Sequence, residues 1–350
     1  MNINDSDVNR LLTTFQCKQP DRVPVFEYWI TSQTIIEYVL GRPTQSEIID
    51  ASRGESSITP ADEVEYALRV GMDAVGANFP WRPNNIFRKA SDGIEHYIDG
   101  GIKTMDDFKH LDPPTPLMVH LERLDRYLEA AKGTGVGVYA NLTSFFDSCY
   151  LAMGVQDFLM KTRDDLPLIE HLMDLLLERQ LQAMEAVCKY PEVAFVFIND
   201  DIAFHNGLFI QPDLFRSIFV PRMKKLVAPA RKAGKILTFH TDGDLRDVIP
   251  ILLDLGFSAL QPIEPWSNDI YKLKEQYKGK LCLMGNIDTG ILAFSAKDEI
   301  EKDVKEHIDK LADGGGYVLG SCTSIFEGIP PENYQHMVEV GVKYGREVYL

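Results

Sequence analysis

Eight short runs of apolar and β-branched residues recur along the chain, and stretches with helical periodicity separate them. This alternation is typical of a parallel sheet covered by helices, because each parallel strand needs a crossover before the next. Eight consecutive strand–helix units predict an α/β fold, the closed (β/α)8 TIM barrel. The expected strands are residues 23–29, 73–78, 136–142, 193–199, 235–240, 259–263, 281–285 and 316–320. The expected helices include residues 60–70, 166–189, 212–233, 245–255, 296–311 and 331–349.

One segment interrupts the alternation after the second strand. Residues 86–102 hold two runs of alternating polarity on either side of Ser91, Asp92 and Gly93, a sequence that favours a tight turn. We therefore predict a β-hairpin inserted into the barrel. No linker-like or repetitive segment divides the 350 residues, so residues 1–350 are expected to form one domain.

The charge balance limits the partners of the chain. It holds 52 acidic and 36 basic residues and has a net charge of −16, which disfavours nucleic acids and anionic membrane surfaces. The first residues lack the basic-then-apolar order of a secretory signal, and we expect a cytoplasmic protein without membrane spans. The five cysteines are widely spaced and are expected to be reduced, which leaves them available to a metal ion.

In a barrel of this kind the chemistry lies at the carboxyl ends of the strands. These ends carry an unusual number of polar groups, which are expected to converge on one mouth: Glu27, Tyr28, Asn141, Asn199, Asp200, Asp201, His240, Asp242, Asp244, Gln261, Glu264, Asn286, Asp288, Ser321 and Cys322. Aromatic residues near the mouth would form a flat apolar slot for an aromatic ring. The expected substrate-binding residues are Tyr28, Trp81, Phe145, Phe146, Asn199 and Trp266.

Each of these residues also has a purely structural interpretation. A strand-end histidine such as His240 is often held by a neighbouring hydrogen-bond partner, and Asp242 could cap the next helix. Asp200 and Asp201 cannot both face the mouth if strand alternation persists, so one of them is expected to be structural. Cys322 could be a small core residue, and about half of the aromatic residues could pack helices against the barrel.

Several short motifs follow one another along the chain. They include Asp21-Arg22-Val23-Pro24, Tyr150-Leu151-Ala152-Met153-Gly154, Asp200-Asp201, His240-Thr241-Asp242-Gly243-Asp244, Gly285-Asn286-Ile287-Asp288 and Gly314-Gly315-Gly316-Tyr317. With these motifs the chain resembles the uroporphyrinogen decarboxylase superfamily, which includes cobalamin-dependent methyltransferases. The resemblance implies the same barrel and a reaction at its mouth. It leaves the reaction open, because one fold supports many activities.

Departures from the family patterns favour one branch. The decarboxylases open their first strand with an Arg-rich segment for a polycarboxylate substrate, whereas this chain has Phe26-Glu27-Tyr28-Trp29-Ile30 there. In the methyltransferases that act on thiols, the family pattern is a His-x-Cys-Gly motif at the fifth strand and a further Cys at the eighth, and these residues together bind zinc. His240 and Cys322 match that pattern, but Asp242 replaces the first Cys. A carboxylate is a harder ligand than a thiolate, so activation of a thiol substrate is disfavoured.

The chain is most similar to corrinoid-dependent O-demethylase methyltransferases, which move a methyl group from a methoxylated aromatic acid to the cobalt of a corrinoid protein. A zinc pattern proposed for some of them is reproduced in its spacing by Asp254, Cys282 and Cys322. The predicted strands put Asp254 in a helix and Cys282 near the start of a strand. We therefore place the metal, with zinc as the candidate, at His240, Asp242 and Cys322, with Glu27 or Asp201 as a further ligand.

The resemblance implies His240, Asp201 and Glu27 as catalytic residues, and Asp201 or His240 as a general acid if no metal is bound. It also implies a separate corrinoid-binding protein as partner, with the corrinoid cofactor carried by that protein, and a homodimer is a candidate assembly. Arg22 and Arg82 are candidates for binding a substrate carboxylate. The alternatives are a porphyrinogen-type decarboxylase, a thiol-directed methylcobamide methyltransferase and a non-catalytic barrel that binds a corrinoid partner.

Overall fold

The computed structural model describes residues 2–50, 55–89 and 95–349. Its central feature is a parallel sheet of seven strands in the order β13-β12-β11-β10-β7-β6-β3. The strands are β3 (Ala74–Phe79), β6 (Gly137–Thr143), β7 (Val193–Asn199), β10 (Ile236–His240), β11 (Ala259–Gln261), β12 (Cys282–Met284) and β13 (Tyr317–Val318). Each coincides with a predicted strand or lies within one or two residues of it, which confirms the predicted parallel α/β sheet.

The eighth position of the barrel is occupied by the segment around Val25. This residue forms parallel bridges to Met72, which precedes β3, and to Leu319, which follows β13. The segment thereby closes the sheet into the predicted (β/α)8 barrel. The continuous strand expected over residues 23–29 is not formed, and in this part of the chain the structure has isolated β-bridges at Val25 and Ile30 instead. Pro24 contributes to this difference, because it has no backbone N–H for a ladder hydrogen bond.

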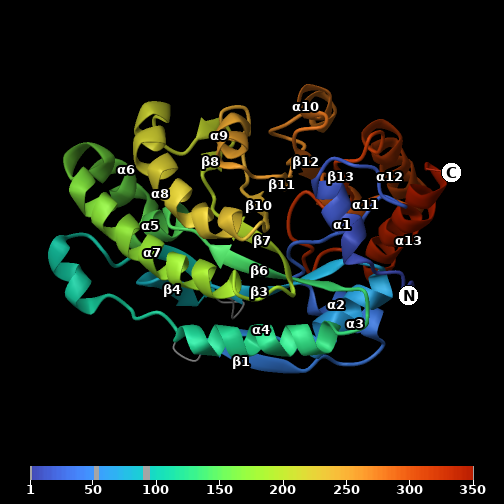
Figure 1. The fold of residues 1–350 in the computed structure, drawn as a ribbon, viewed down its shortest axis with the longest axis horizontal. Coiled ribbons are helices and arrows are strands. Elements are labelled where there is room, and N and C mark those ends of the chain that lie inside the picture. The colour runs from blue at the N-terminus through green and yellow to red at the C-terminus, as the bar shows by residue number, and fades with distance from the viewer. Residues whose placement is uncertain (1, 51–54, 90–94, 350) are drawn as a thin grey trace.

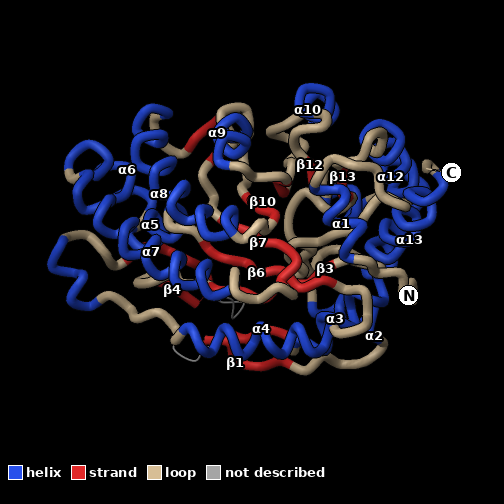
Figure 2. The backbone as a smooth tube through the Cα atoms, viewed as in Figure 1, coloured by secondary structure: helices blue, strands red, loops and turns tan. Residues whose placement is uncertain are grey.

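Helices surround the sheet, as Figures 1 and 2 show. Six of them match the helices expected from the sequence: α3 (Pro60–Val70), α7 (Leu166–Val187), α8 (Pro212–Lys232), α9 (Val248–Leu255), α12 (Lys297–Leu311) and α13 (Pro331–Glu347). The remaining described helices are α1 (Val8–Phe15), α2 (Gln33–Leu40), the 3-10 helix η1 (Met105–His110), α4 (Leu117–Ala131), α5 (Phe146–Met153), α6 (Val155–Asp164), α10 (Ile270–Tyr277) and α11 (Thr289–Phe294). Among the described residues, no helix is both long enough and apolar enough to span a membrane.

Three antiparallel hairpins extend from the barrel. The predicted insertion is confirmed as β4 (Asn85–Lys89) paired with β5 (Glu95–Gly100), while its expected turn at residues 91–93 lies outside the described residues. A short pair, β8 (Ala203–Phe204) and β9 (Gly207–Leu208), follows β7. The sequence did not predict the third hairpin, formed by β1 (Ser46–Asp50) and β2 (Glu55–Ile58).

Helix α1 closes the amino-terminal end of the barrel. Its Leu11 and Phe15 belong to the apolar cluster inside the barrel, and the ring of Phe15 meets that of Phe195 at 5.1 Å. Arg10 on the same helix lies 2.6 Å from Asp73, a fully buried residue that precedes β3. The amino-terminal end is thus filled by packing and buried ion pairs, which leaves the carboxyl ends of the strands as the accessible end.

Candidate functional site

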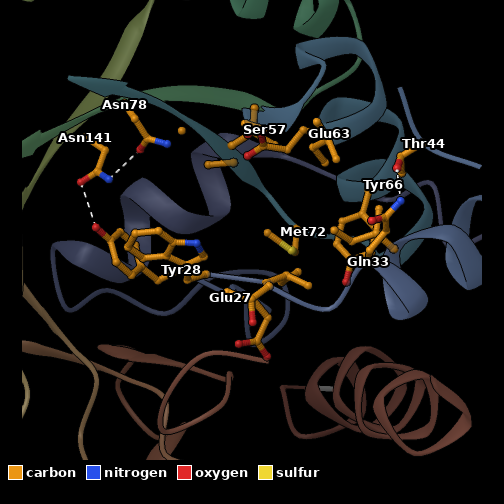
Figure 3. Close-up of a pocket in the computed structure, with 18 of the residues that line it drawn as sticks. Glu27, Tyr28, Gln33, Thr44, Ser57, Glu63, Tyr66, Met72, Asn78 and Asn141 are labelled. Carbon is orange, nitrogen blue, oxygen red and sulfur yellow. Dashed lines mark hydrogen bonds between the residues drawn. The ribbon is translucent and has the colours of Figure 1, made fainter. Parts of the chain in front are cut away.

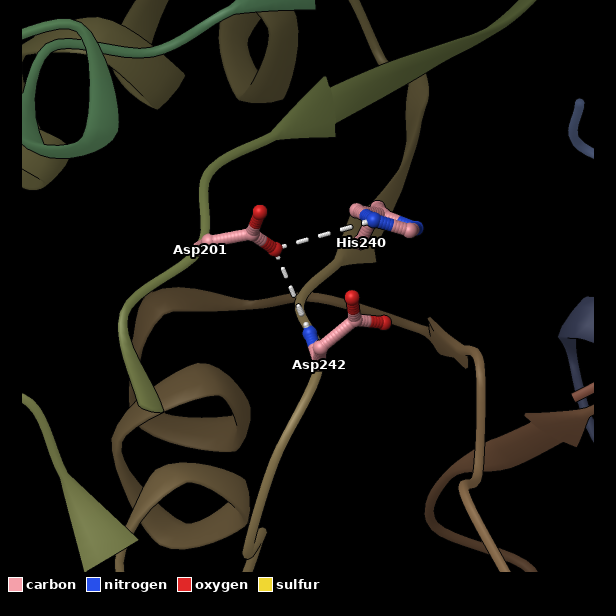
Figure 4. Close-up of side chains that lie close together, drawn as sticks. All are labelled: Asp201, His240 and Asp242. Carbon is pink, nitrogen blue, oxygen red and sulfur yellow. Dashed lines mark hydrogen bonds and ion pairs between the residues drawn. The ribbon is translucent and has the colours of Figure 1, made fainter. Parts of the chain in front are cut away.

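Three side chains with metal-binding atoms meet at the carboxyl end of the barrel (Figure 4). Asp201 follows β7, His240 ends β10 and Asp242 lies two residues further on. One ligand atom from each lies within 4.8 Å of the others. The parallel register aligns His240 with Asn199, so the two strands end side by side and deliver the three groups to one place.

The imidazole of His240 is held on two sides. Its Nδ1 lies 2.5 Å from Oε1 of Gln261, and its ring stacks on that of Tyr28 with 4.7 Å between the centroids. An amide oxygen can only accept, so Nδ1 donates in this contact, and Nε2 is the ring nitrogen left for another partner. Nε2 faces Asp201, whose Oδ1 is 3.7 Å away. The histidine is therefore oriented to act as a ligand or a proton acceptor through Nε2.

The acids of the cluster have unusual surroundings. Burial raises the pKa of Asp242 to about 6, the charges of Asp201 and Glu264 raise it as well, and His240 opposes the rise. Glu264 accepts a hydrogen bond of 2.7 Å from the backbone N–H of Gly243. Gly243 has φ of +93°, and a Cβ atom there would lie 2.7 Å from the backbone oxygen of Phe204. Only glycine fits this turn, which keeps Asp242 and Glu264 close to each other.

The donor set fits a divalent metal ion. One imidazole nitrogen and two carboxylates suit zinc and other first-row divalent ions. Cys322 of the predicted set of His240, Asp242 and Cys322 is not in this group, because only ligand atoms of Asp201, His240 and Asp242 lie within 4.8 Å of one another among the described residues. Asp201 takes the third place instead. Cys322 is fully buried, and burial raises the pKa of its thiol to about 12.

The spacing pattern of Asp254, Cys282 and Cys322 does not form a site either. Cys282 is the first residue of β12, so it lies toward the amino-terminal end of the barrel, whereas Cys322 lies beyond the carboxyl end of β13. Asp254 lies within α9. Cys282 is fully buried, and burial raises the pKa of its thiol. Zinc ligands must approach one ion to about 2.0–2.3 Å, which these positions do not allow.

The two neighbouring acids after β7 have different roles, as strand alternation predicts. Asp200 is fully buried and accepts hydrogen bonds from the backbone N–H groups of Phe146 and Asp147 at 3.3 and 2.6 Å. It thereby fixes the beginning of α5, where a carboxylate also complements the helix dipole. Asp201 keeps 38% of its side chain exposed at the mouth.

Glu27 and Tyr28 are placed differently from the metal cluster. Glu27 is 4% exposed; its Oε1 accepts a hydrogen bond of 3.1 Å from the backbone N–H of Ser321, and its Oε2 lies 2.5 Å from the Oγ of Ser321. Burial raises its pKa to about 7. The Tyr28 hydroxyl accepts a hydrogen bond from Asn199 at 2.7 Å and donates one to Asn141 at 3.1 Å. Tyr28 therefore links the His240 cluster to the opposite side of the barrel.

A cavity of about 450 Å³ lies on that side (Figure 3). It is bounded by the first barrel segment, β3 and the β1–β2 hairpin. Its lining residues include Glu27, Tyr28, Trp29, Gln33, Thr44, Ser57, Glu63, Tyr66, Met72, Asn78, Tyr139 and Asn141. Sequence analysis missed Ser57, because the β1–β2 hairpin was not predicted, and it missed Glu63 on α3 and Asn78 on β3. Asn78 ends a predicted strand, and that position was the signal that could have found it. The size suits a small organic molecule.

Three of the predicted aromatic residues lie away from this cavity. Phe145 and Phe146 are fully buried, and their rings lie 5.4 and 6.2 Å from that of Phe219 on α8. They pack helix α5 against α8 and do not line a substrate slot. Trp81 is 8% exposed and donates its indole N–H to the backbone oxygen of Asp112.

The other substrate-binding candidates lie closer to the mouth. Tyr28 lines the cavity, and Asn199 is its hydrogen-bond donor. Trp266 is 52% exposed in the loop that follows β11. The two arginines considered for a substrate carboxylate have other partners: Arg22 is fully buried and donates to Asp5 and to backbone oxygens, and Arg82 lies 2.8 Å from Asp147.

The family model "Uroporphyrinogen decarboxylase (URO-D)" matches residues 89–344, which include every strand of the barrel from β6 onward. The chain belongs to the URO-D family. Curated URO-D relatives include the uroporphyrinogen decarboxylases of Geotalea uraniireducens and Geotalea daltonii, which are 36% and 34% identical to it over 74 residues. Each alignment covers 21% of this chain and 21% of the relative, so only about a fifth of each relative's length is matched.

A solved structure extends the URO-D comparison to the whole chain. A methyltransferase from Methanosarcina mazei superposes with a TM-score of 0.69 and covers 100% of both chains, at 19% sequence identity. At that identity the comparison establishes the fold, and it confirms the predicted URO-D-type barrel over the full length.

Proposed function

We propose that the chain is the methyltransferase component of a corrinoid-dependent O-demethylase. It would move a methyl group from a methoxylated aromatic compound to the cobalt of a separate corrinoid-binding protein. The observation that carries this proposal is the cluster of Asp201, His240 and Asp242 beside an aromatic wall, in a barrel that resembles a methyltransferase over its full length. The sequence departure at the first strand also favours methyl transfer over porphyrinogen decarboxylation.

The chemical demand of this reaction is on the leaving group. When a methyl group leaves an aryl ether, negative charge builds on a phenolic oxygen, which leaves poorly without neutralisation. Asp242, whose pKa is about 6, holds a proton more readily near neutral pH than an ordinary aspartate does. It can therefore donate that proton from its carboxyl group to the departing oxygen, while Asp201 holds the backbone of Asp242 by accepting from its N–H at 3.3 Å.

The same residues fit a divalent metal ion, for which zinc is the candidate. His240 through Nε2 and the carboxylates of Asp201 and Asp242 would hold it, and Gln261 would fix the imidazole from behind. When bound, such an ion supplies Lewis-acid polarisation of a substrate oxygen. Cys322 is not required in this set.

The acceptor of the methyl group is proposed to be carried by a partner protein that docks over the barrel mouth. Exposed aromatic side chains from loops at the carboxyl ends of the strands support this proposal. They include Trp29, Phe204, Trp266 and Phe326, which are 48%, 65%, 52% and 39% exposed. Tryptophan and phenylalanine are enriched at protein interfaces.

The test combines metal analysis with a methyl-transfer assay. The purified protein is incubated with a reduced corrinoid-binding protein and a panel of methoxylated aromatic compounds, and methylcobalamin absorbance is recorded. We expect methylation with wild type and with the control variant His110→Gln, whose histidine lies on η1 outside the site. We expect none with His240→Gln. Silence of the wild type across the panel would overturn the proposal.

A measurement of metal content distinguishes the two ways in which the departing oxygen could be assisted, by a metal ion or by a proton from Asp242. About one equivalent of metal that is lost in Asp201→Asn and His240→Gln but retained in Cys322→Ala would support the metal-assisted form. A metal-free protein that still transfers methyl groups would support proton donation by Asp242.

The family name also suggests decarboxylation, since the curated relatives are uroporphyrinogen decarboxylases. A product assay with uroporphyrinogen tests this alternative directly. The lining residues of the cavity among the described residues include no lysine, arginine or histidine, which disfavours a substrate with many carboxylates.

A further inference from the structure

The cavity beside Tyr28 has a chemical character that limits what it can bind. Carboxyl, hydroxyl and amide groups line it together with aromatic rings, and no basic side chain does so among the described residues. A carboxylate moved from water into such a space would lose its hydration without gaining an opposite charge, which is unfavourable. This distinguishes the cavity from a site for an aromatic acid.

Glu27 and Glu63 are the acidic side chains among the described lining residues, and Glu63 is the more exposed of the two. It is half-buried on α3, lines the cavity and accepts a hydrogen bond from the hydroxyl of Tyr127. Arg123 donates to Tyr127 and also to Glu47 on β1. The guanidinium of Arg123, whose charge acts on Glu63, is therefore also paired with the carboxylate of Glu47 on the hairpin. A carboxylate has about four lone-pair sites, so Glu63, which accepts from the Tyr127 hydroxyl and from the backbone N–H of Gly76, retains acceptor capacity for a ligand in the cavity that it lines.

The opposite wall is aromatic and leads to the reaction site. Tyr28, Trp29 and Tyr139 contribute to it, and Tyr28 also stacks on His240. Aromatic faces favour a flat ring, and they also attract cations. A ring compound in the cavity would thus lie one side chain away from the cluster of Asp201, His240 and Asp242.

We propose that this cavity recognises the head group of the methyl donor, and that this head group is a non-anionic hydrogen-bond donor, a hydroxyl or an ammonium, received by Glu63. The inference rests on the proposed methyl-transfer function for the identity of the ligand as methyl donor. It replaces the aromatic acid that the sequence suggests with a methoxylated aromatic alcohol or amine.

Binding is tested separately from methyl transfer, with demethylated ring compounds that differ only in the head group. Calorimetry would compare tyramine, 2-(4-hydroxyphenyl)ethanol and 4-hydroxyphenylacetate. We expect the amine or the alcohol to bind at least tenfold more tightly than the acid. Glu63→Gln should weaken the amine about tenfold and the alcohol much less, which distinguishes the two head groups. Glu65→Gln serves as the matched control, because Glu65 lies on the same helix but pairs with Arg42 and Arg69.

Two outcomes would overturn the inference: tighter binding of the acid, or unchanged binding of all three compounds in Glu63→Gln. The acid is also measured with Arg53→Gln, because Arg53 lies between β1 and β2 in the sequence and outside the described residues. Acid binding that disappears in Arg53→Gln would assign the head-group site to that arginine and contradict the proposal.

The corresponding methoxylated compounds then separate this inference from the proposed function. Amine or alcohol binding without methylation of a corrinoid protein would overturn the methyl-transfer proposal and leave the recognition site. Methylation that proceeds from 4-methoxyphenylacetate alone would support the proposed function and overturn the head-group assignment.

Discussion

At the scale of single residues, Glu27 shows how burial sets the protonation state of a side chain. The Oγ of Ser321 lies 2.5 Å from both Glu27 Oε2 and the backbone oxygen of Thr323. A hydroxyl has one proton, so it cannot donate to both oxygens. A protonated Glu27 resolves this conflict, because it donates to Ser321, which then donates to Thr323. The raised pKa of about 7 agrees with this arrangement.

This leads to a prediction for Glu27→Gln. The pKa of Glu27 is about 7 in the folded protein and near 4.5 when exposed. Its contribution to stability is therefore fully present below the unfolded pKa and is lost as the pH rises through the folded value, by up to about 3 kcal/mol. Glutamine imitates the protonated form, so the variant should match wild type at pH 4.5 and exceed it in unfolding free energy at pH 8. Urea denaturation at both pH values measures this.

Glu65→Gln provides the opposite case. Hydrogen bonds from Arg42 and Arg69 lower the pKa of Glu65, so its neutral variant should be no more stable than wild type at pH 8. A stability of Glu27→Gln that parallels wild type at both pH values would show that Glu27 stays ionised in the folded protein.

At the scale of helices and strands, how well an element can be predicted from the sequence depends on whether the pattern that indicates it is local. Fully buried parallel strands such as β7 are continuous apolar runs, and they were predicted almost to the residue. Helix α3 carries its own boundaries, since Thr59 caps its first turn and Gly71 ends it with φ of +70°. The β1–β2 hairpin lacks such signals.

The same distinction applies to the site. Asp201, His240 and Asp242 were all expected at the mouth, because strand ends are visible in the sequence. Whether Cys322 joins this group depends on how the side chains pack across the mouth of the barrel, which no local pattern encodes. Likewise, the aromatic ring of Phe146 is of a kind that could line a substrate slot, but it packs between helices α5 and α8.

The packing role of Phe146 gives a prediction at this scale. It is fully buried at the beginning of α5, with rings of α8 around it. Phe146→Ala should lower the unfolding free energy by about 3–5 kcal/mol through lost burial and a residual cavity. At temperatures where the variant is folded, it should bind ligands in the Tyr28 cavity as wild type does. Thermal unfolding and calorimetry measure the two effects, and a loss of ligand affinity without a loss of stability would restore Phe146 as a substrate-binding residue.

At the scale of the whole molecule, the two ends of the barrel have different electrostatic organisation. At the amino-terminal end, Asp73 is fully buried and lies 2.6 Å from Arg10 and 3.7 Å from Arg22. These opposite charges compensate one another inside the packed end of the barrel. At the carboxyl end, Asp201 and Asp242 face His240, and Arg82 adds a positive charge that acts on Asp201 and pairs with Asp147 at 2.8 Å. In TIM barrels the first arrangement is typical of stability and the second of function.

A pair of isosteric variants tests this division. Asp73→Asn removes a buried charge and leaves two buried guanidinium groups with fewer partners, so it should cost about 3 kcal/mol of unfolding free energy. Metal binding at the mouth should be unchanged. Asp201→Asn should do the reverse, because Asp201 is half-exposed and its charge is unfavourably close to that of Asp242. Its stability should stay within about 0.5 kcal/mol of wild type, as for other surface substitutions, while metal affinity falls. Chemical denaturation gives the unfolding free energy of each variant, and metal titration gives its metal affinity. Equal losses of stability in the two variants would mean that stability and function are not divided between the two ends of the barrel.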